Sequence, residues 1–285
     1  MAPASKEVAT KDKASTEVAL YDYGDYAGQG FENQTAADRV IPFVKIMQVG
    51  SKEVKAKDST LRAGQLVNSA TGEVYASDKG LLIVPAITDH VFVEYRPRSQ
   101  GSGFVGRHKE TDPIVQEAKA QAAKFNKKFG RYNTAYASDG TETGNELTET
   151  FYVHAIICDE KDALGWATLA FDSTDIKVYK KWNEGPAGYK VVPMPDGSKA
   201  AAPMFSHLVR VTTEENKYPG GDSFNFVLKP AKGTIKDSAL PTNDPRFQAG
   251  AQLCGFVKKG LVKVAVDQDR QSEGDGVGSG KPAPF

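Results

Sequence analysis

The sequence predicts a mainly β, α+β fold, and three observations support this class. Short segments rich in β-branched and aromatic residues recur along the chain, each bounded by Gly, Pro, Asn or Asp. Helical patterns are isolated, so the regular alternation that builds a parallel sheet is missing. The chain has 285 residues, enough to bury a large core in one β-rich domain. We therefore expect a β-barrel or sandwich with inserted helices.

Seven apolar segments have the length and composition of strands. The core begins near residues 40–43, and residues 159–165 (DEKDALG) are expected to turn the third strand back onto the fourth as a hairpin. In chain order, the predicted strands are residues 80–88, 90–95, 150–158, 166–171, 205–213, 224–228 and 261–266.

Three segments have the caps and periodicity of helices. Asp followed by Pro opens the first and the third, because Asp suits the cap position and Pro the first turn. A Ser-Thr pair opens the second, and a glycine follows each segment. The predicted helices are residues 112–129, 173–184 and 244–259.

Composition divides the chain into an arm, a domain and a tail. Residues 1–38 have scattered apolar residues that form no face, so we expect a disordered arm. Residues 39–266 are expected to form a single β-rich domain. Residues 267–285 form an acidic, Gly- and Ser-rich tail that is also predicted to be disordered.

Charge and cysteine content indicate a soluble intracellular protein. The 36 basic and 36 acidic side chains balance, so the whole molecule is not a polycation. The two cysteines, Cys158 and Cys254, lie in apolar runs and suit buried thiols in a reducing cytosol. The start lacks an apolar signal segment, and no run is long enough to span a bilayer. We expect a cytoplasmic location.

Residues 95–108 (YRPRSQGSGFVGRH) combine arginines, aromatics and glycines in what the pattern predicts to be a loop. Gly101, Gly103 and Gly106 match the G-x-G-x-x-G spacing of a dinucleotide site. Such a site needs the glycines to lead directly from a strand into a helix. Here Pro97 interrupts the approach and the next helix opens only at Asp112, so the glycines are better interpreted as hinges.

The surroundings of this segment favour single-stranded nucleic acid instead. Residues 95–132 carry nine Lys or Arg against three acids. Cations that alternate with aromatics suit phosphates and exposed bases, and residues 124–132 and 177–182 repeat this alternation. The alternative is that the aromatics anchor helices on the core while the lysines stay in solvent. The predicted nucleic-acid-binding residues are Tyr95, Arg96, Arg98, Phe104, Arg107, Lys127, Lys128, Arg131, Tyr132, Lys180 and Trp182.

Local signatures of catalysis are missing from the sequence. It contains no P-loop, no G-x-S-x-G elbow, no H-E-x-x-H helix and no C-x-x-C pair. His154 and Cys158 have a helical metal-ligand spacing, but their segment is predicted to be a strand. We therefore predict no catalytic site, no metal and no cofactor.

The layout resembles the single-stranded DNA-binding proteins of bacteria and their bacteriophages, through its β-rich core, basic-aromatic segments and acidic tail ending in Pro284-Phe285. The phage members are the nearer resemblance. It implies an OB-fold that binds the strand and a tail that recruits replication proteins. Lys281 stands where the bacterial tail tip is acidic, which departs from that pattern.

We therefore expect sequence-independent binding and protection of single-stranded DNA during phage replication or recombination. The expected partners are single-stranded DNA, replication proteins at Pro284 and Phe285, and further copies of the chain, without a membrane. A phage structural or assembly protein that forms homo-oligomers through its arms is the main alternative. A metal-dependent enzyme acting on nucleic acid is the third.

Overall fold

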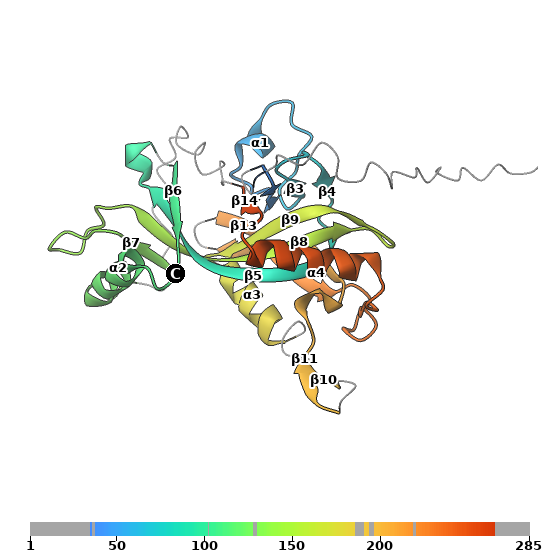
Figure 1. The fold of residues 1–285 in the computed structure, drawn as a ribbon. Coiled ribbons are helices and arrows are strands. Elements are labelled where there is room, and N and C mark those ends of the chain that lie inside the picture. The colour runs from blue at the N-terminus through green and yellow to red at the C-terminus, as the bar shows by residue number, and fades with distance from the viewer. Residues whose placement is uncertain are drawn as a thin grey trace, which may run out of the picture. The chain divides into compact units, whose positions relative to one another are not determined.

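A computed structural model describes residues 35, 38–101, 103–127, 130–185, 191–193, 197–218 and 221–265. The strands are β1 (Val40–Ile41), β2 (Val44–Ile46), β3 (Leu66–Asn68), β4 (Val74–Tyr75), β5 (Leu81–Arg96), β6 (Gly103–His108), β7 (Arg131–Asn133), β8 (Glu146–Cys158), β9 (Ala163–Asp172), β10 (Val191–Pro193), β11 (Lys199–Ala201), β12 (Val209–Tyr218), β13 (Gly221–Pro230) and β14 (Lys263–Val264). The helices are α1 (Lys52–Lys55), α2 (Pro113–Lys124), α3 (Asp175–Glu184) and α4 (Pro245–Lys258). The mainly β class is confirmed (Figure 1).

A seven-stranded sheet forms the centre, with the order β13-β12-β5-β8-β7 and with β6 and β9 paired to β5 and β8. The prediction of separate strands at residues 80–88 and 90–95 is wrong, because β5 is one strand of 16 residues. Its register against β8 shifts between Pro85 and Ile87, where proline cannot donate a ladder hydrogen bond. This irregularity lets one long strand bend across the sheet.

The hairpin predicted at residues 159–165 is confirmed. β8 and β9 pair antiparallel, with Ile157 opposite Gly165 and Cys158 opposite Ala163. Leu164 therefore lies in a bulge at the end of the hairpin, where an extra residue is left outside the pairing.

The two faces of the central sheet carry different apolar clusters. Ile83 and Ile157 pack with residues of α3, whereas their neighbours Val84 and Ile156 pack against α4. Figure 1 shows α4 lying along β5 and β8, with α3 extending from the other side of these strands. Successive residues of a strand point to opposite faces, so one run of apolar residues fills both clusters.

The three predicted helices are all present. α2 is shorter than predicted, because Asn126 takes a left-handed φ of 51° and the Lys127 N–H donates back to the Ala122 carbonyl at 3.0 Å. The cap predicted for α4 is confirmed by the Asp244 carboxylate, which accepts a hydrogen bond from the Arg246 N–H at 2.9 Å.

Several short strands escaped the prediction. β2, β3 and β4 form a second small sheet, and β10 pairs with β11. β1 was also missed, and it pairs in parallel with β14, which lies within the strand predicted at residues 261–266. Strands of two or three residues are too short to show alternation. The described strands form open sheets, and their pairings include no barrel closure.

The two cysteines are free thiols. Cys158 is buried and Cys254 is half-buried, and burial raises the pKa of the Cys158 thiol to about 12. The predicted tail, and nearly all of the predicted arm, lie outside the described residues.

Candidate nucleic-acid interface

The structure divides the predicted basic-aromatic surface between the two faces of the central sheet. Phe92 on β5 packs with Tyr132 and with α2. The next residue, Val93, belongs to a different cluster that contains Tyr95 and Tyr152. The continuous surface expected from Tyr95 to Tyr132 is therefore not formed, because the strand alternation separates its two ends.

The segment predicted to be a glycine loop is a β-hairpin. β6 pairs with the end of β5, placing Tyr95 opposite Phe104, and Gly101 turns the chain with a φ of 87°. Tyr95 is only 8% exposed and meets Phe104 edge to face, so a base could not stack on it without opening the hairpin. Arg96 is exposed, and the side chain of Arg98 lies outside the described residues.

Arg107 is directed into the protein. Its Nε donates to the Tyr152 hydroxyl at 3.3 Å, its Nη1 donates to the Val264 carbonyl at 3.3 Å, and its Nη2 donates to the Ala265 carbonyl. The guanidinium carbon also lies 5.2 Å from the centre of the Phe104 ring. Arg107 thus fastens the hairpin to β14 and the residue that follows it.

The segment after α2 contributes fewer exposed groups than predicted. Tyr132 is 8% exposed and packs beneath α2, where it cannot offer a face to a base. Lys127 is exposed, with its ammonium 3.8 Å from the Glu142 carboxylate. Lys128 lies outside the described residues.

Helix α3 separates its aromatics from its cations. Ile176, Tyr179 and Trp182 are buried at a three-residue spacing, and Trp182 is only 3% exposed. The prediction that Trp182 stacks on bases therefore has no exposed ring to support it. The lysines Lys177, Lys180 and Lys181 are exposed.

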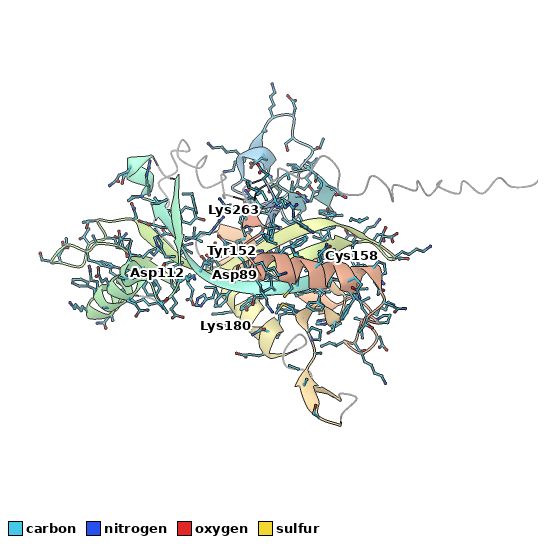
Figure 2. All side chains as sticks on the ribbon, viewed as in Figure 1. Asp89, Asp112, Tyr152, Cys158, Lys180 and Lys263 are labelled. Atoms are coloured by element: carbon cyan, nitrogen blue, oxygen red, sulfur yellow. The ribbon has the colours of Figure 1, made fainter. Side chains whose placement is uncertain are left out.

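Arg131 extends this basic face beyond the helix. Its Nη2 donates to the Ser173 hydroxyl at 2.8 Å, immediately before α3, and Lys177 follows one turn later. We call Arg131, Lys177, Lys180 and Lys181 the α3 cation row. Lys180 is labelled on α3 in Figure 2. Within the described part of the chain, the three lysines form no ion pair.

An aromatic stack lies beside the α3 cation row. The Phe151 ring lies between His90, at 4.3 Å, and Tyr179, at 4.4 Å between ring centres. The Lys180 ammonium is 5.9 Å from the centre of the half-buried Phe151 ring. Sequence analysis missed His90 and Phe151, because they lie on separate strands far from residues 177–182 and carry no local signal.

Carboxylates limit the basic character at the far end of this stack. His90 Nε2 is 3.0 Å from the Glu149 carboxylate, and its Nδ1 is 3.7 Å from that of Glu110. Glu110 also accepts a hydrogen bond from Lys119 at 2.7 Å. The part of this face best suited to an anion is therefore the α3 side.

Asp175 joins the start of α3 to β13. Its carboxylate accepts hydrogen bonds from the Asn225 side chain at 2.9 Å and from the Phe226 N–H at 3.0 Å. Burial raises the pKa of Asp175 to about 7, although these hydrogen bonds act in the opposite direction. The α3 cation row thus begins beside a half-buried carboxyl group whose pKa is raised to about 7.

Comparison with known proteins identifies a phage family. Residues 10–263 match the family model of the Pam3 phage gp34-like protein. The chain belongs to this family. The predicted bacteriophage origin of this gp34-like protein is thereby confirmed. Among curated proteins and among solved structures, no match was found.

Two predictions for this gp34-like protein concern membranes and its tail. None of the helices in the described part of the chain combines the length and apolar character needed to cross a bilayer. Pro284 and Phe285, the predicted partner-binding residues, lie outside the described residues.

Proposed function

We propose that this gp34-like protein binds single-stranded DNA without sequence preference, using the α3 cation row and the Phe151 ring beside it. The observation that carries the proposal is the separation of groups on α3. The aromatics of the helix pack on the core, which leaves its lysines exposed, and Arg131 bonds to Ser173 just before the helix and lies 4.0 Å from the Glu146 carboxylate. Such a row suits a phosphate backbone, whose binding depends on spaced cations.

The aromatic contribution comes from a different residue than the sequence suggested. Phe151 is half-buried beside Lys180, but His90 and Tyr179 stack on its two faces, so only the edge of its ring borders the row. A base cannot stack on a ring whose two faces are covered, so the cations supply the affinity and Phe151 adds only an apolar edge to the site. An OB-fold is not required for this mode of binding, because the cations lie on a helix.

A role in phage DNA replication or recombination, with protein partners recruited at Pro284 and Phe285, belongs to the same proposal. It is supported by the phage family and by the tail composition. Exposed apolar groups on another part of the molecule favour protein contacts as well.

The test is a fluorescence titration of labelled oligo-dT at several salt concentrations. Four cation contacts should give a slope of log affinity against log salt of roughly −3, because each contact contributes about 0.7 for single strands. Reversing three charges in Lys177→Glu/Lys180→Glu/Lys181→Glu should weaken binding at least about tenfold and flatten the slope to roughly −1.

The matched control is Lys52→Glu/Lys55→Glu/Lys57→Glu, which makes the same charge change on and beside α1. This control should bind like the unmodified protein. If both triple variants lose the same DNA affinity, the loss comes from the change in net charge, and the proposed site is overturned. Repeating the titration with Mg²⁺ and checking the length of the oligonucleotide separates binding from cleavage.

A further inference from the structure

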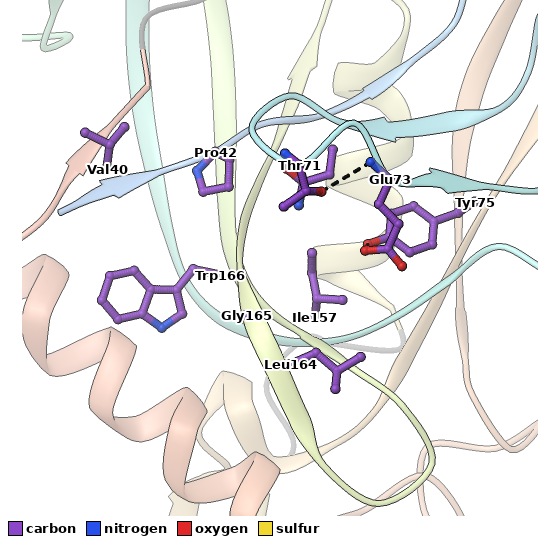
Figure 3. A pocket seen from close by; sticks show the side chains of 10 residues that line it. Val40, Pro42, Thr71, Glu73, Tyr75, Ile157, Leu164, Gly165 and Trp166 are labelled. Carbon is purple, nitrogen blue, oxygen red and sulfur yellow. Dashed lines mark hydrogen bonds between the residues drawn. The ribbon is translucent and has the colours of Figure 1, made fainter. Parts of the chain in front are cut away.

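An open pocket of about 340 Å³ lies between β1, the β3–β4 turn and the β8–β9 hairpin. Figure 3 shows its apolar lining, with Pro42, Ile157, Leu164 and Trp166 around the centre. Gly165 also lines the pocket, and a Cβ added there would meet nothing within 4 Å. The pocket thus has room beside the hairpin for an apolar side chain.

Apolar groups project beside this opening. Leu164, in the bulge of the β8–β9 hairpin, is 61% exposed, the largest value among the exposed large apolar residues of the described chain. Val40 on the opposite rim is 45% exposed. Exposed apolar groups that surround a pocket typically mark a protein contact. A projection and a hollow therefore lie next to each other on one surface.

The rim carries charges of opposite sign on its two sides. Glu73 lies on one side, where its carboxylate accepts a hydrogen bond from the Tyr75 hydroxyl at 2.8 Å. Burial and the Glu73 carboxylate raise the pKa of Tyr75, so its hydroxyl remains a donor. On the other side, exposed Lys263 is the register partner of Val40. Figure 3 places Val40 and Glu73 on opposite sides of the pocket.

We propose that this surface binds the same surface of a second copy of the chain, forming a two-fold dimer. In a two-fold interface both copies use the same surface, so a residue on one side of the axis meets a residue from the other side of the second copy. An apolar centre with an acidic side and a basic side is therefore complementary to a second copy of itself. Rotation about the two-fold axis brings Glu73 of one copy to Lys263 of the other, and each Leu164 to the other copy's pocket. The zero net charge of the chain adds no overall repulsion to such a contact.

This inference does not depend on the proposed DNA binding, because the pocket residues and the α3 cation row do not overlap. Sedimentation velocity of the full chain, without DNA, tests it first. The protein should change from monomer to dimer with rising concentration, up to roughly 100 μM, the range of weak protein contacts. Sedimentation as a monomer throughout that range would overturn the proposal.

Leu164→Asp tests the apolar contact. It should raise the dimer dissociation constant at least about a hundredfold, because a carboxylate would enter an apolar pocket. Val49→Asp is the matched control, since Val49 is 47% exposed and does not line the pocket. A Leu164→Asp variant that dimerises as well as the Val49→Asp variant would contradict the proposed contact. A thermal melt of each variant confirms that it is folded.

A charge exchange tests the predicted pairing itself. Glu73→Lys and Lys263→Glu should each weaken dimerisation roughly tenfold, because each places like charges together across the interface. The double variant should return the dissociation constant to within about threefold of the original, since it restores opposite charges. If the effects of the two single variants on the dimerisation free energy simply add in the double variant, the two-fold arrangement is excluded.

Discussion

The β5–β6 hairpin and helix α3 have similar sequence patterns but opposite outcomes. Both interleave aromatics with cations, as RPRSQGSGFVGR in one and KVYKKW in the other. In the hairpin, Arg107 turns inward and bonds to Tyr152 and to backbone carbonyls. In α3 the aromatics turn inward, and the lysines remain exposed.

The geometry of each element explains the difference. A helix with apolar residues three and four apart collects them on one side and leaves its cations on the other. The hairpin instead places each residue on one of two sheet faces, and the long Arg107 side chain reaches across Tyr152 to β14. Interleaving in sequence therefore does not by itself establish a binding surface.

Removing the largest buried side chain of α3 should have the largest effect. Trp182→Ala should lower the free energy of unfolding by about 3–5 kcal/mol, because Trp182 is 3% exposed and packs in the main core. In the hairpin, Phe104→Ala should cost much less, about 1 kcal/mol, since Phe104 is only half-buried. Urea denaturation at constant pH measures both values.

The conservative variant Trp182→Phe distinguishes packing from base stacking. It should recover most of the stability and should leave the oligo-dT affinity unchanged, because the ring faces the core. A stable Trp182→Phe variant with tenfold weaker DNA binding would restore Trp182 as a stacking residue.

Local signals predicted the elements well where those elements are long or capped. The Asp-Pro openings located α2 and α4, and the turn at residues 159–165 located the β8–β9 hairpin. The single strand β5 was divided in two at Asp89, because an aspartate resembles a break when the partner strand β8 is unknown. Whether a strand continues through such a residue depends on the strand it pairs with. That partner is distant in sequence, so a local sequence pattern does not reveal it.

Asp175 should give α3 a dependence on pH. Its folded pKa is raised to about 7, so between about pH 4 and pH 7 the folded state holds a proton that the unfolded chain releases. The contribution of Asp175 to the free energy of unfolding is therefore greatest below about pH 4, and it is lost as the pH rises to the folded pKa of about 7. Asp175→Asn keeps the oxygen that accepts from Asn225 and Phe226 while removing the charge.

We compare the free energy of unfolding of Asp175→Asn with that of the unmodified protein at pH 5 and at pH 8. The difference between the two proteins should change by on the order of 2 kcal/mol between these pH values. The variant should gain relative stability at the higher pH. Thermal and urea denaturation at both values measure this change, and Asp58→Asn on the exposed surface is the control. Equal pH profiles for Asp175→Asn and Asp58→Asn would show that the Asp175 carboxylate is not held out of water.

The predicted site was recovered only in part, because burial reassigns side chains of the same type. Arg131 and Lys180 come together at α3, while Tyr95, Tyr132 and Trp182 join apolar clusters. Whether an aromatic faces the core depends on what covers it, and here α2, α3 and β6 supply the cover. For residues 177–182, the alternative in which the aromatics anchor the helix on the core and the lysines stay in solvent describes α3 correctly.

The smallest of these effects should come from the hairpin arginines, and it decides whether the comparison with α3 holds. Arg107→Ala should lower the free energy of unfolding by about 1–2 kcal/mol, because it leaves the Val264 and Ala265 carbonyls without their charged donor. Arg107→Lys should lose nearly as much, since an ammonium cannot reproduce the guanidinium's several donors. Arg96→Ala, at an exposed position, should stay within about 0.5 kcal/mol of the original. All three should keep their oligo-dT affinity within about twofold, whereas an Arg107→Ala variant of normal stability and much weaker DNA binding would move the interface back to the hairpin.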